Sequence, residues 1–289
     1  ILHIALLAVS LAALPIIPDV SWKPLGDEEP GMRILGLLAA TIGLPYFLLS
    51  TTGPLIQAWF ARSYPSSTVY RLFALSNLAS LLALIAYPFA VEPWITTAQQ
   101  AWSWTAGYVV FVILCAGVAL KSRSATSSLP TAEGETAAAD AGAPPAAGQF
   151  LLWLTLSGMG SFMLLAVTNH ITHDVASVPF LWILPLSIYL VTFILCFEGR
   201  SWYKRVYFLG PLIVIIGAMA WALHAERGIQ NIKEAIPLFS AGLFVACMFF
   251  HGELANMKPA PKYLTSYYLM VSLGGASVSY THLRAHETR

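Results

Sequence analysis

Long apolar runs separated by short polar stretches fill most of this chain. An apolar helix of about 20 residues crosses a hydrocarbon core of about 30 Å, and runs near that length recur here. Inside lipid, backbone polar groups must be satisfied within the protein, which an α-helix does by itself. The pattern therefore predicts an all-α, polytopic transmembrane helical bundle. We expect about nine spans, at residues 1–17, 34–60, 70–90, 102 or 104 to 120, 151–167, 178–197, 206–224, 236–250 and 264 onward.

One stretch interrupts this pattern. Residues 121–148 are rich in Ala, Ser, Thr, Gly and Pro and contain almost no large apolar side chains. Such a composition buries too little apolar surface to offset the entropy of ordering, so we predict a disordered linker. It divides the chain into an N-terminal helix group, residues 1–120, of about four spans and a C-terminal helix group, residues 149–277, of about five.

Composition narrows the class of protein further. Hydrophobic residues make up 57% of the chain and charged residues 10%, whereas soluble domains carry roughly a quarter charged residues. A net charge of +1 is too small to indicate binding to nucleic acid. The expected partner is the lipid bilayer. The cysteines Cys115, Cys196 and Cys247 lie inside apolar runs, where we interpret them as small buried hydrophobes and expect neither a metal nor a cofactor. Because the chain begins at Ile1 within an apolar run, we expect a truncated reading frame.

The distribution of Lys and Arg among the loops predicts the orientation, because cytoplasmic loops carry an excess of both. Loops near Glu92 and at residues 170–174 carry neither, and we expect them outside. Two loops, one with Lys23 and Arg33 and one with Arg227 and Lys233, run against this assignment. The loops that we expect in the cytoplasm hold Arg62, Arg71, Lys121, Arg123, Arg200, Lys204, Arg205, Lys258 and Lys262.

The first candidate for chemistry is a polar cluster, His170, His173 and Asp174, between two predicted spans that are antiparallel neighbours. His170 and Asp174 share a face if that turn is helical. An imidazole beside a carboxylate binds a metal or transfers a proton. The structural alternative is a solvated cluster at the membrane interface, with Asp174 capping the next helix. Polar clusters of this kind are more often structural, which favours the second interpretation.

Two weaker candidates lie elsewhere. His251 and Glu253 end a predicted span and suggest a gate, a proton site or a domain contact at the cytoplasmic mouth. Their i, i+2 spacing points them to different faces, which disfavours a shared metal. Thr51, Thr52 and Asn77 lie near proline breaks, where freed carbonyls line substrate sites in transporters. The commoner case is a proline kink whose backbone is satisfied by hydroxyl groups.

Several order-specific motifs are shared with a known family. They are Gly43-Leu44-Pro45-Tyr46-Phe47 with Ser50-Thr51-Thr52, Pro54-Leu55 and Gln57, then Ser76-Asn77-Leu78 and Tyr87-Pro88-Phe89, then His170, Asp174, Val178-Pro179-Phe180-Leu181-Trp182, Leu184-Pro185-Leu186 and Tyr189-Leu190, and last His251-Gly252-Glu253-Leu254, Lys258-Pro259-Ala260-Pro261, Leu264-Thr265, Tyr267-Tyr268-Leu269 and Leu273-Gly274-Gly275-Ala276. With these, the chain resembles the membrane portion of the bacterial proteins described as fused major-facilitator-like/spermidine synthase. The resemblance implies an inner-membrane location and a C-terminal synthase-like domain as partner.

No catalytic residue of the synthase domain carries over to this chain. Its Gly-x-Gly, Gly158-Met159-Gly160, lies within an apolar helix-length run and not after a strand, so it is no nucleotide loop. The last residues, 278–289, depart from the family pattern and resemble sequencing-adapter read-through, so we expect a non-native tail there. The sequence predicts a membrane module that anchors the synthase domain and handles a small polar or cationic solute. The alternatives are a membrane-embedded enzyme using His170 and Asp174, a stand-alone transporter-like protein and a purely structural anchor.

Overall fold

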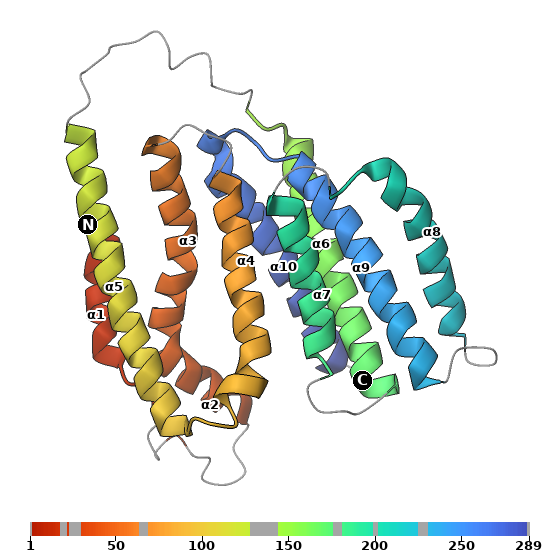
Figure 1. Cartoon of the computed structure of the whole chain (residues 1–289), viewed down its shortest axis with the longest axis horizontal. Coiled ribbons are helices and arrows are strands. Elements are labelled where there is room, and N and C mark those ends of the chain that lie inside the picture. Colours follow the sequence, from red (N-terminus) through yellow and green to blue (C-terminus); the bar gives the residue numbers. More distant parts are fainter. Residues whose placement is uncertain are drawn as a thin grey trace. The chain divides into compact units, whose positions relative to one another are not determined.

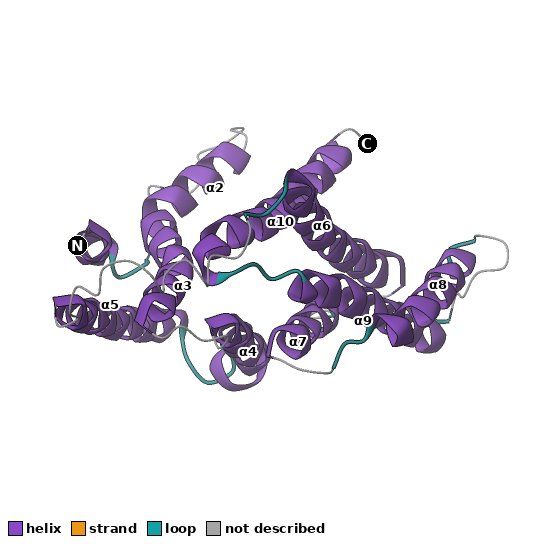
Figure 2. Ribbon diagram, turned by 90° about the horizontal axis from the view of Figure 1, so that it is seen from above, coloured by secondary structure: helices purple, strands orange, loops and turns teal. Residues whose placement is uncertain are grey.

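Helices are the regular elements of the computed structural model, and the residues that it describes contain no strand (Figures 1 and 2). The structure describes residues 2–17, 22, 30–63, 69–127, 144–175, 181–198, 202–224 and 231–287. The predicted all-α helical fold is confirmed. The helices are α1 (Leu2–Ser10), α2 (Pro30–Leu38), α3 (Leu44–Ser63), α4 (Val69–Ala86), α5 (Thr97–Ser127), α6 (Ala147–Asn169), α7 (Ile183–Glu198), α8 (Arg205–Ala222), α9 (Ile232–Asn256) and α10 (Leu264–Glu287).

Six segments of the described chain are long and apolar enough to cross a membrane, as in a multi-pass membrane protein. Two more of the predicted spans form shorter apolar helices, Leu2–Ala13 and Ile183–Glu198. The helix that begins at Leu264 is not among the six. The six are Gly31–Gln57, Tyr70–Val91, Thr97–Leu120, Ala147–Thr172, Arg205–Ala222 and Ile232–Asn256.

The predicted linker is shorter on both sides in the structure. Helix α5 continues through Ser127, and α6 begins at Ala147, so residues 121–127 and 147–148 are helical. Small residues such as Ala and Ser continue a helix at little cost, which explains the extension. The prediction of disorder for residues 128–143 lies outside the described residues.

The chain divides into two compact units, Ile1–Pro65 with Ala86–Gly134 and Ser66–Ile85 with Glu135–Arg289. Helix α4 therefore packs with the second unit although it precedes the linker in the sequence. The hydropathy of the sequence identifies α4 as a span but does not determine which helices pack against it. The two units are thus not the two helix groups that the linker separates along the chain.

The first unit is held together by α1, α3 and α5. Leu7, Leu48, Tyr108 and Val112 form the centre of its core. The Ser10 hydroxyl lies 2.7 Å from the Tyr108 hydroxyl and links α1 to α5. Upstream of α3, the chain passes through a π-helical segment, Ala39–Gly43, which precedes the break expected at the prolines of this span.

Helix α9 is the central helix of the second unit. It packs against α6, α7 and α8, and 56% of its membrane-length segment is buried. The core beside it includes Val167, Phe239, Leu243 and Cys247. Helix α6 packs against α10 on its other side. Within the second unit, α6 therefore lies between α9 and α10.

Candidate functional site

The polar cluster at residues 170–174 continues helix α6 as a π-helical segment, His170–Val175. The His170 ring packs against the Phe239 ring of α9, with centroids 4.3 Å apart. The Thr172 hydroxyl donates to the Thr168 carbonyl at 2.7 Å. The side chains of His173 and Asp174 lie outside the described residues, so the predicted pairing of His170 with Asp174 stays a prediction.

His251 lies in the interior of the second unit. Its side chain is fully buried, with 0% exposure. Two aromatic rings of α7 enclose it, with centroids 4.0 Å away for Phe193 and 4.7 Å away for Tyr189. Helix α6 approaches from the other side, where a Cβ atom on Gly160 would lie 3.0 Å from His251 Nε2. His251 of α9 is therefore buried against α6 and α7, and its predicted location near the cytoplasmic mouth stays a prediction.

Hydrogen bonding fixes the tautomer of His251. The Thr192 hydroxyl donates its only hydrogen to the Tyr189 carbonyl at 2.8 Å. The same oxygen lies 3.0 Å from His251 Nδ1, so Nδ1 carries the proton and donates. Nε2 is then an acceptor, and it has no hydrogen-bond partner in the described part of the chain. A buried acceptor without a donor is uncommon in proteins.

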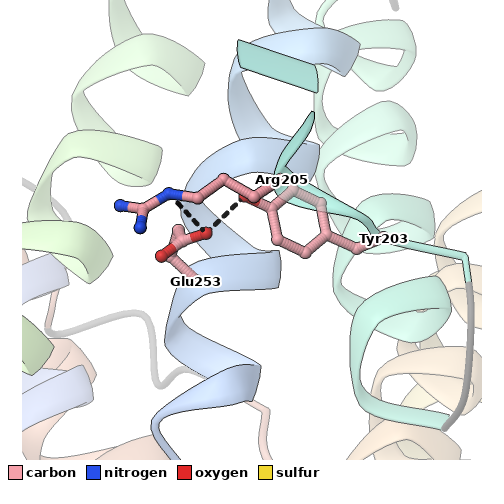
Figure 3. Close-up of polar contacts among 3 residues, drawn as sticks. All are labelled: Tyr203, Arg205 and Glu253. Atoms are coloured by element: carbon pink, nitrogen blue, oxygen red, sulfur yellow. Dashed lines mark hydrogen bonds and ion pairs between the residues drawn. The ribbon is translucent and has the colours of Figure 1, made fainter. Parts of the chain in front are cut away.

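Glu253, two residues further along α9, faces a different neighbour (Figure 3). Its Oε1 accepts a 2.6 Å hydrogen bond from the Tyr203 hydroxyl and lies 3.4 Å from Arg205 Nε. Burial, followed by the hydrogen bond to Glu253, raises the pKa of Tyr203. These contacts fasten the start of α8 to the end of α9. Because His251 and Glu253 point to different faces, as their spacing predicts, they do not form one site.

The hydroxyl groups of Thr51 and Thr52 bond to their own helix. Thr51 donates to the Phe47 carbonyl at 3.0 Å, and Thr52 donates to the Leu48 carbonyl at 2.6 Å. Thr52 Oγ1 also lies 2.8 Å from His3 Nε2 of α1. This arrangement is that of a proline-containing helix whose hydroxyl groups satisfy backbone carbonyls.

Asn77 makes the same kind of contact in the second unit. Its side-chain amide donates to the Phe73 carbonyl of its own helix at 2.9 Å. Thr51 and Thr52 belong to the first unit and Asn77 to the second. A common site lined by all three residues stays a prediction.

Sequence reasoning overlooked a cluster of side chains at the end of α9. The Trp153 indole donates to the Met257 carbonyl at 3.1 Å, and the Tyr70 hydroxyl donates to the Pro259 carbonyl at 2.6 Å. The Tyr267 hydroxyl donates to the Leu254 carbonyl at 3.0 Å. Leu254 lies in the last turn of α9, and Met257 and Pro259 lie in the segment that follows the helix. The three side chains therefore supply donors at a helix end, where carbonyls lack partners within the helix. The Lys-Pro-Ala-Pro sequence marks this turn, but nothing in the sequence identifies the donors.

The described ranges contain no group of three or more His, Cys, Asp or Glu residues arranged to hold a metal ion. The three cysteines are buried and form no disulfide. Gly158 and Gly160 lie inside α6, where Gly158 faces α10 and Gly160 faces His251.

Comparison with protein-family models, with curated proteins and with solved structures finds no match to this chain.

Proposed function

We propose that this chain is the membrane module of a spermidine-synthase-like fusion protein, in which the helices anchor a synthase-like domain at a bacterial inner membrane. The observation that carries the proposal is the set of contacts made by residues 251–268, which belong to one stretch of the resemblance. His251 lies between α6, α7 and α9, and Glu253 fastens α8. Tyr267 holds the end of α9 through the Leu254 carbonyl. These residues build a scaffold of packed helices, which suits an anchor.

The hydrogen bonds of the other polar candidate residues favour an anchoring role over transport of a solute. A transporter for a small polar or cationic solute needs polar groups that face a cavity near the middle of the membrane. The polar groups of Thr51, Thr52 and Asn77 are instead bonded to carbonyls of their own helices. Helix α9, at the centre of the second unit, is more than half buried at 56%. Close packing of this kind supports a fixed platform.

The enzyme alternative depends on His170 and Asp174. His170 makes a ring contact with Phe239, which is the kind of packing contact that a structural residue makes. Replacing His170 by Gln separates the two alternatives. If the imidazole is catalytic, the variant protein loses its enzymatic activity; if the imidazole serves in packing, the activity of the protein is unchanged.

The complete gene provides the test of the proposed function. The gene should be sequenced beyond the codon for Ala276. We expect the encoded protein to carry out aminopropyl transfer, with the activity in the membrane fraction. Deleting the helices should release the activity into the soluble fraction. A complete protein without aminopropyl transfer, or one whose activity does not depend on the helices for membrane association, would contradict the proposal.

A further inference from the structure

Lys258 occupies an unusual position for a charged side chain, in the turn between α9 and α10. Its ammonium lies 4.6 Å from the ring centroid of Phe197 and 5.3 Å from that of Tyr70. Burial lowers the pKa of Lys258 to about 8, because the charged form loses hydration. The ring faces attract a cation, but they carry no negative charge to neutralise it.

The described residues offer Lys258 no carboxylate. The nearby carboxylate of Glu253 is paired with Arg205, and its Oε1 also accepts from Tyr203. The side chain of Lys258 is therefore held in place by aromatic rings while its charge lacks a counterion in this part of the chain. Partly buried charges are normally paired, so this ammonium is suited to an anion from outside the protein.

The position of the turn relative to the membrane indicates which anion the Lys258 ammonium would contact. The turn follows Ile232–Asn256, a helix long enough to cross a membrane. Aromatic hydrogen-bond donors lie at the same turn, where Trp153 donates to the Met257 carbonyl and Tyr70 donates to the Pro259 carbonyl. Tryptophan and tyrosine are enriched at the level of the lipid headgroups, which places the ammonium beside the headgroup phosphates.

The surrounding charge favours an anionic lipid over a zwitterionic one. Among the described residues, five cations and two carboxylates lie at this end of the second unit. They are Arg71, Lys204, Arg205, Lys258 and Lys262, with Glu198 and Glu253. Such an excess of positive charge attracts an anionic headgroup, whereas it repels the choline group of a zwitterionic lipid.

We propose that Lys258 and its aromatic frame bind the headgroup phosphate of an anionic phospholipid. The Tyr70 and Phe197 rings hold the ammonium at one place, so that the phosphate meets a preorganised cation. Lys262 is the matched control, because it is exposed and its ammonium lies over the neighbouring Tyr263 ring. The site is a property of this chain alone and does not depend on the proposed synthase partner.

The test is lipid binding by the purified chain, measured by native mass spectrometry with phosphatidylglycerol, with phosphatidylcholine or with inorganic phosphate. We expect Lys258→Gln to weaken phosphatidylglycerol binding about fivefold, because a cation that the Tyr70 and Phe197 rings hold at the phosphate realises the full contribution of about 1 kcal/mol. Lys262→Gln should change it less than twofold, and Lys258→Arg should retain most of it. Inorganic phosphate at millimolar concentration should not compete.

Three results would overturn the proposal. They are equal losses in Lys258→Gln and Lys262→Gln, equal retention of phosphatidylcholine and phosphatidylglycerol by the unsubstituted protein, and displacement of the lipid by free phosphate. Thermal unfolding in detergent without lipid checks that Lys258→Gln is folded. If that variant unfolds, Lys258→Met in the same assays replaces it, because methionine retains the apolar stem that lies against the rings.

Discussion

Glycine has different roles in the two units. At Gly53, Gly107 and Gly117 of the first unit, an added Cβ atom would meet nothing within 4 Å. At Gly252 and Gly274 of the second unit, the added atom would overlap the Tyr203 ring and the Leu154 carbonyl oxygen. Small residues let membrane helices approach closely, but the difference shows that a glycine does so only where another segment of the chain passes close to it.

Within the second unit, α8 resembles the first unit in this respect. Gly210 and Gly217 of α8 face open space, with nothing within 4 Å of an added Cβ atom. Close glycine crossings are thus concentrated between α6 and α10 and along α9. Substitutions by alanine turn this comparison into a series of measurements, because each adds the same single methyl group.

The largest effect is expected for Gly274→Ala. The new methyl group would overlap the Leu154 carbonyl oxygen and lie 3.0 Å from the Gly158 amide nitrogen. Both atoms belong to the backbone of α6, so the helices must separate. We expect a loss of about 3 kcal/mol or more, at the upper end of overpacking costs, measured as thermal unfolding in detergent. A cost equal to that of Gly275→Ala, whose methyl group would meet the Ser161 hydroxyl at 3.3 Å, would contradict the crossing.

Gly252→Ala should have the next largest effect. The new methyl group would overlap the Tyr203 ring, which must then turn away and break its 2.6 Å hydrogen bond to Glu253. We expect a cost of about 1–3 kcal/mol. In a Tyr203→Ala background the cost should largely disappear, because residues in contact are not additive. Full additivity in this double-mutant cycle would show that the ring is not the obstacle.

Gly160→Ala should cost less, about 1 kcal/mol. Its methyl group would lie 3.0 Å from His251 Nε2, and a side chain yields more easily than backbone. In a His251→Ala background the same substitution should cost nothing measurable. An unchanged cost in that background would place the imidazole elsewhere.

The smallest effect, and one of opposite sign, is expected for Gly107→Ala in the first unit. An added Cβ atom there meets nothing within 4 Å, and alanine is the better helix former by up to about 1 kcal/mol. We expect unchanged or slightly higher thermal stability. A clear loss would show that α5 is crossed as closely as α6.

Much of the fold follows from the sequence because hydropathy alone determines where a membrane-length helix forms. The runs at residues 70–90 and 206–224 were expected as spans, and the structure has helices at Val69–Ala86 and Arg205–Ala222. The grouping of α4 with the second unit could not be predicted, since contacts such as Tyr70 with the Pro259 carbonyl join residues far apart in the chain.

The candidate sites were harder to predict than the helices. The cluster at His170 attracts attention because its polar residues are adjacent, whereas His251 stands at the end of an apolar run. Yet His251 is the fully buried histidine with an unpartnered nitrogen among the described residues. Its neighbours Thr192 and Gly160 come from other helices, so no local sequence pattern reveals its surroundings. The i, i+2 spacing did predict that His251 and Glu253 face apart.

The crossing of α6 and α10 is tested most directly by a disulfide between them. An added Cβ atom on Gly275 would lie 3.3 Å from the Ser161 hydroxyl oxygen, the atom that the sulfur of a cysteine at position 161 would replace. The side chains of two cysteines at these positions would therefore meet, as a disulfide requires. We predict that Ser161→Cys with Gly275→Cys cross-links efficiently in native membranes under mild oxidation, detected by mass spectrometry of the joined peptides. Gly217→Cys with Gly275→Cys should not cross-link. Cross-linking that fails for the first pair, or that is equal for both pairs, would contradict the close packing on which the second unit is built.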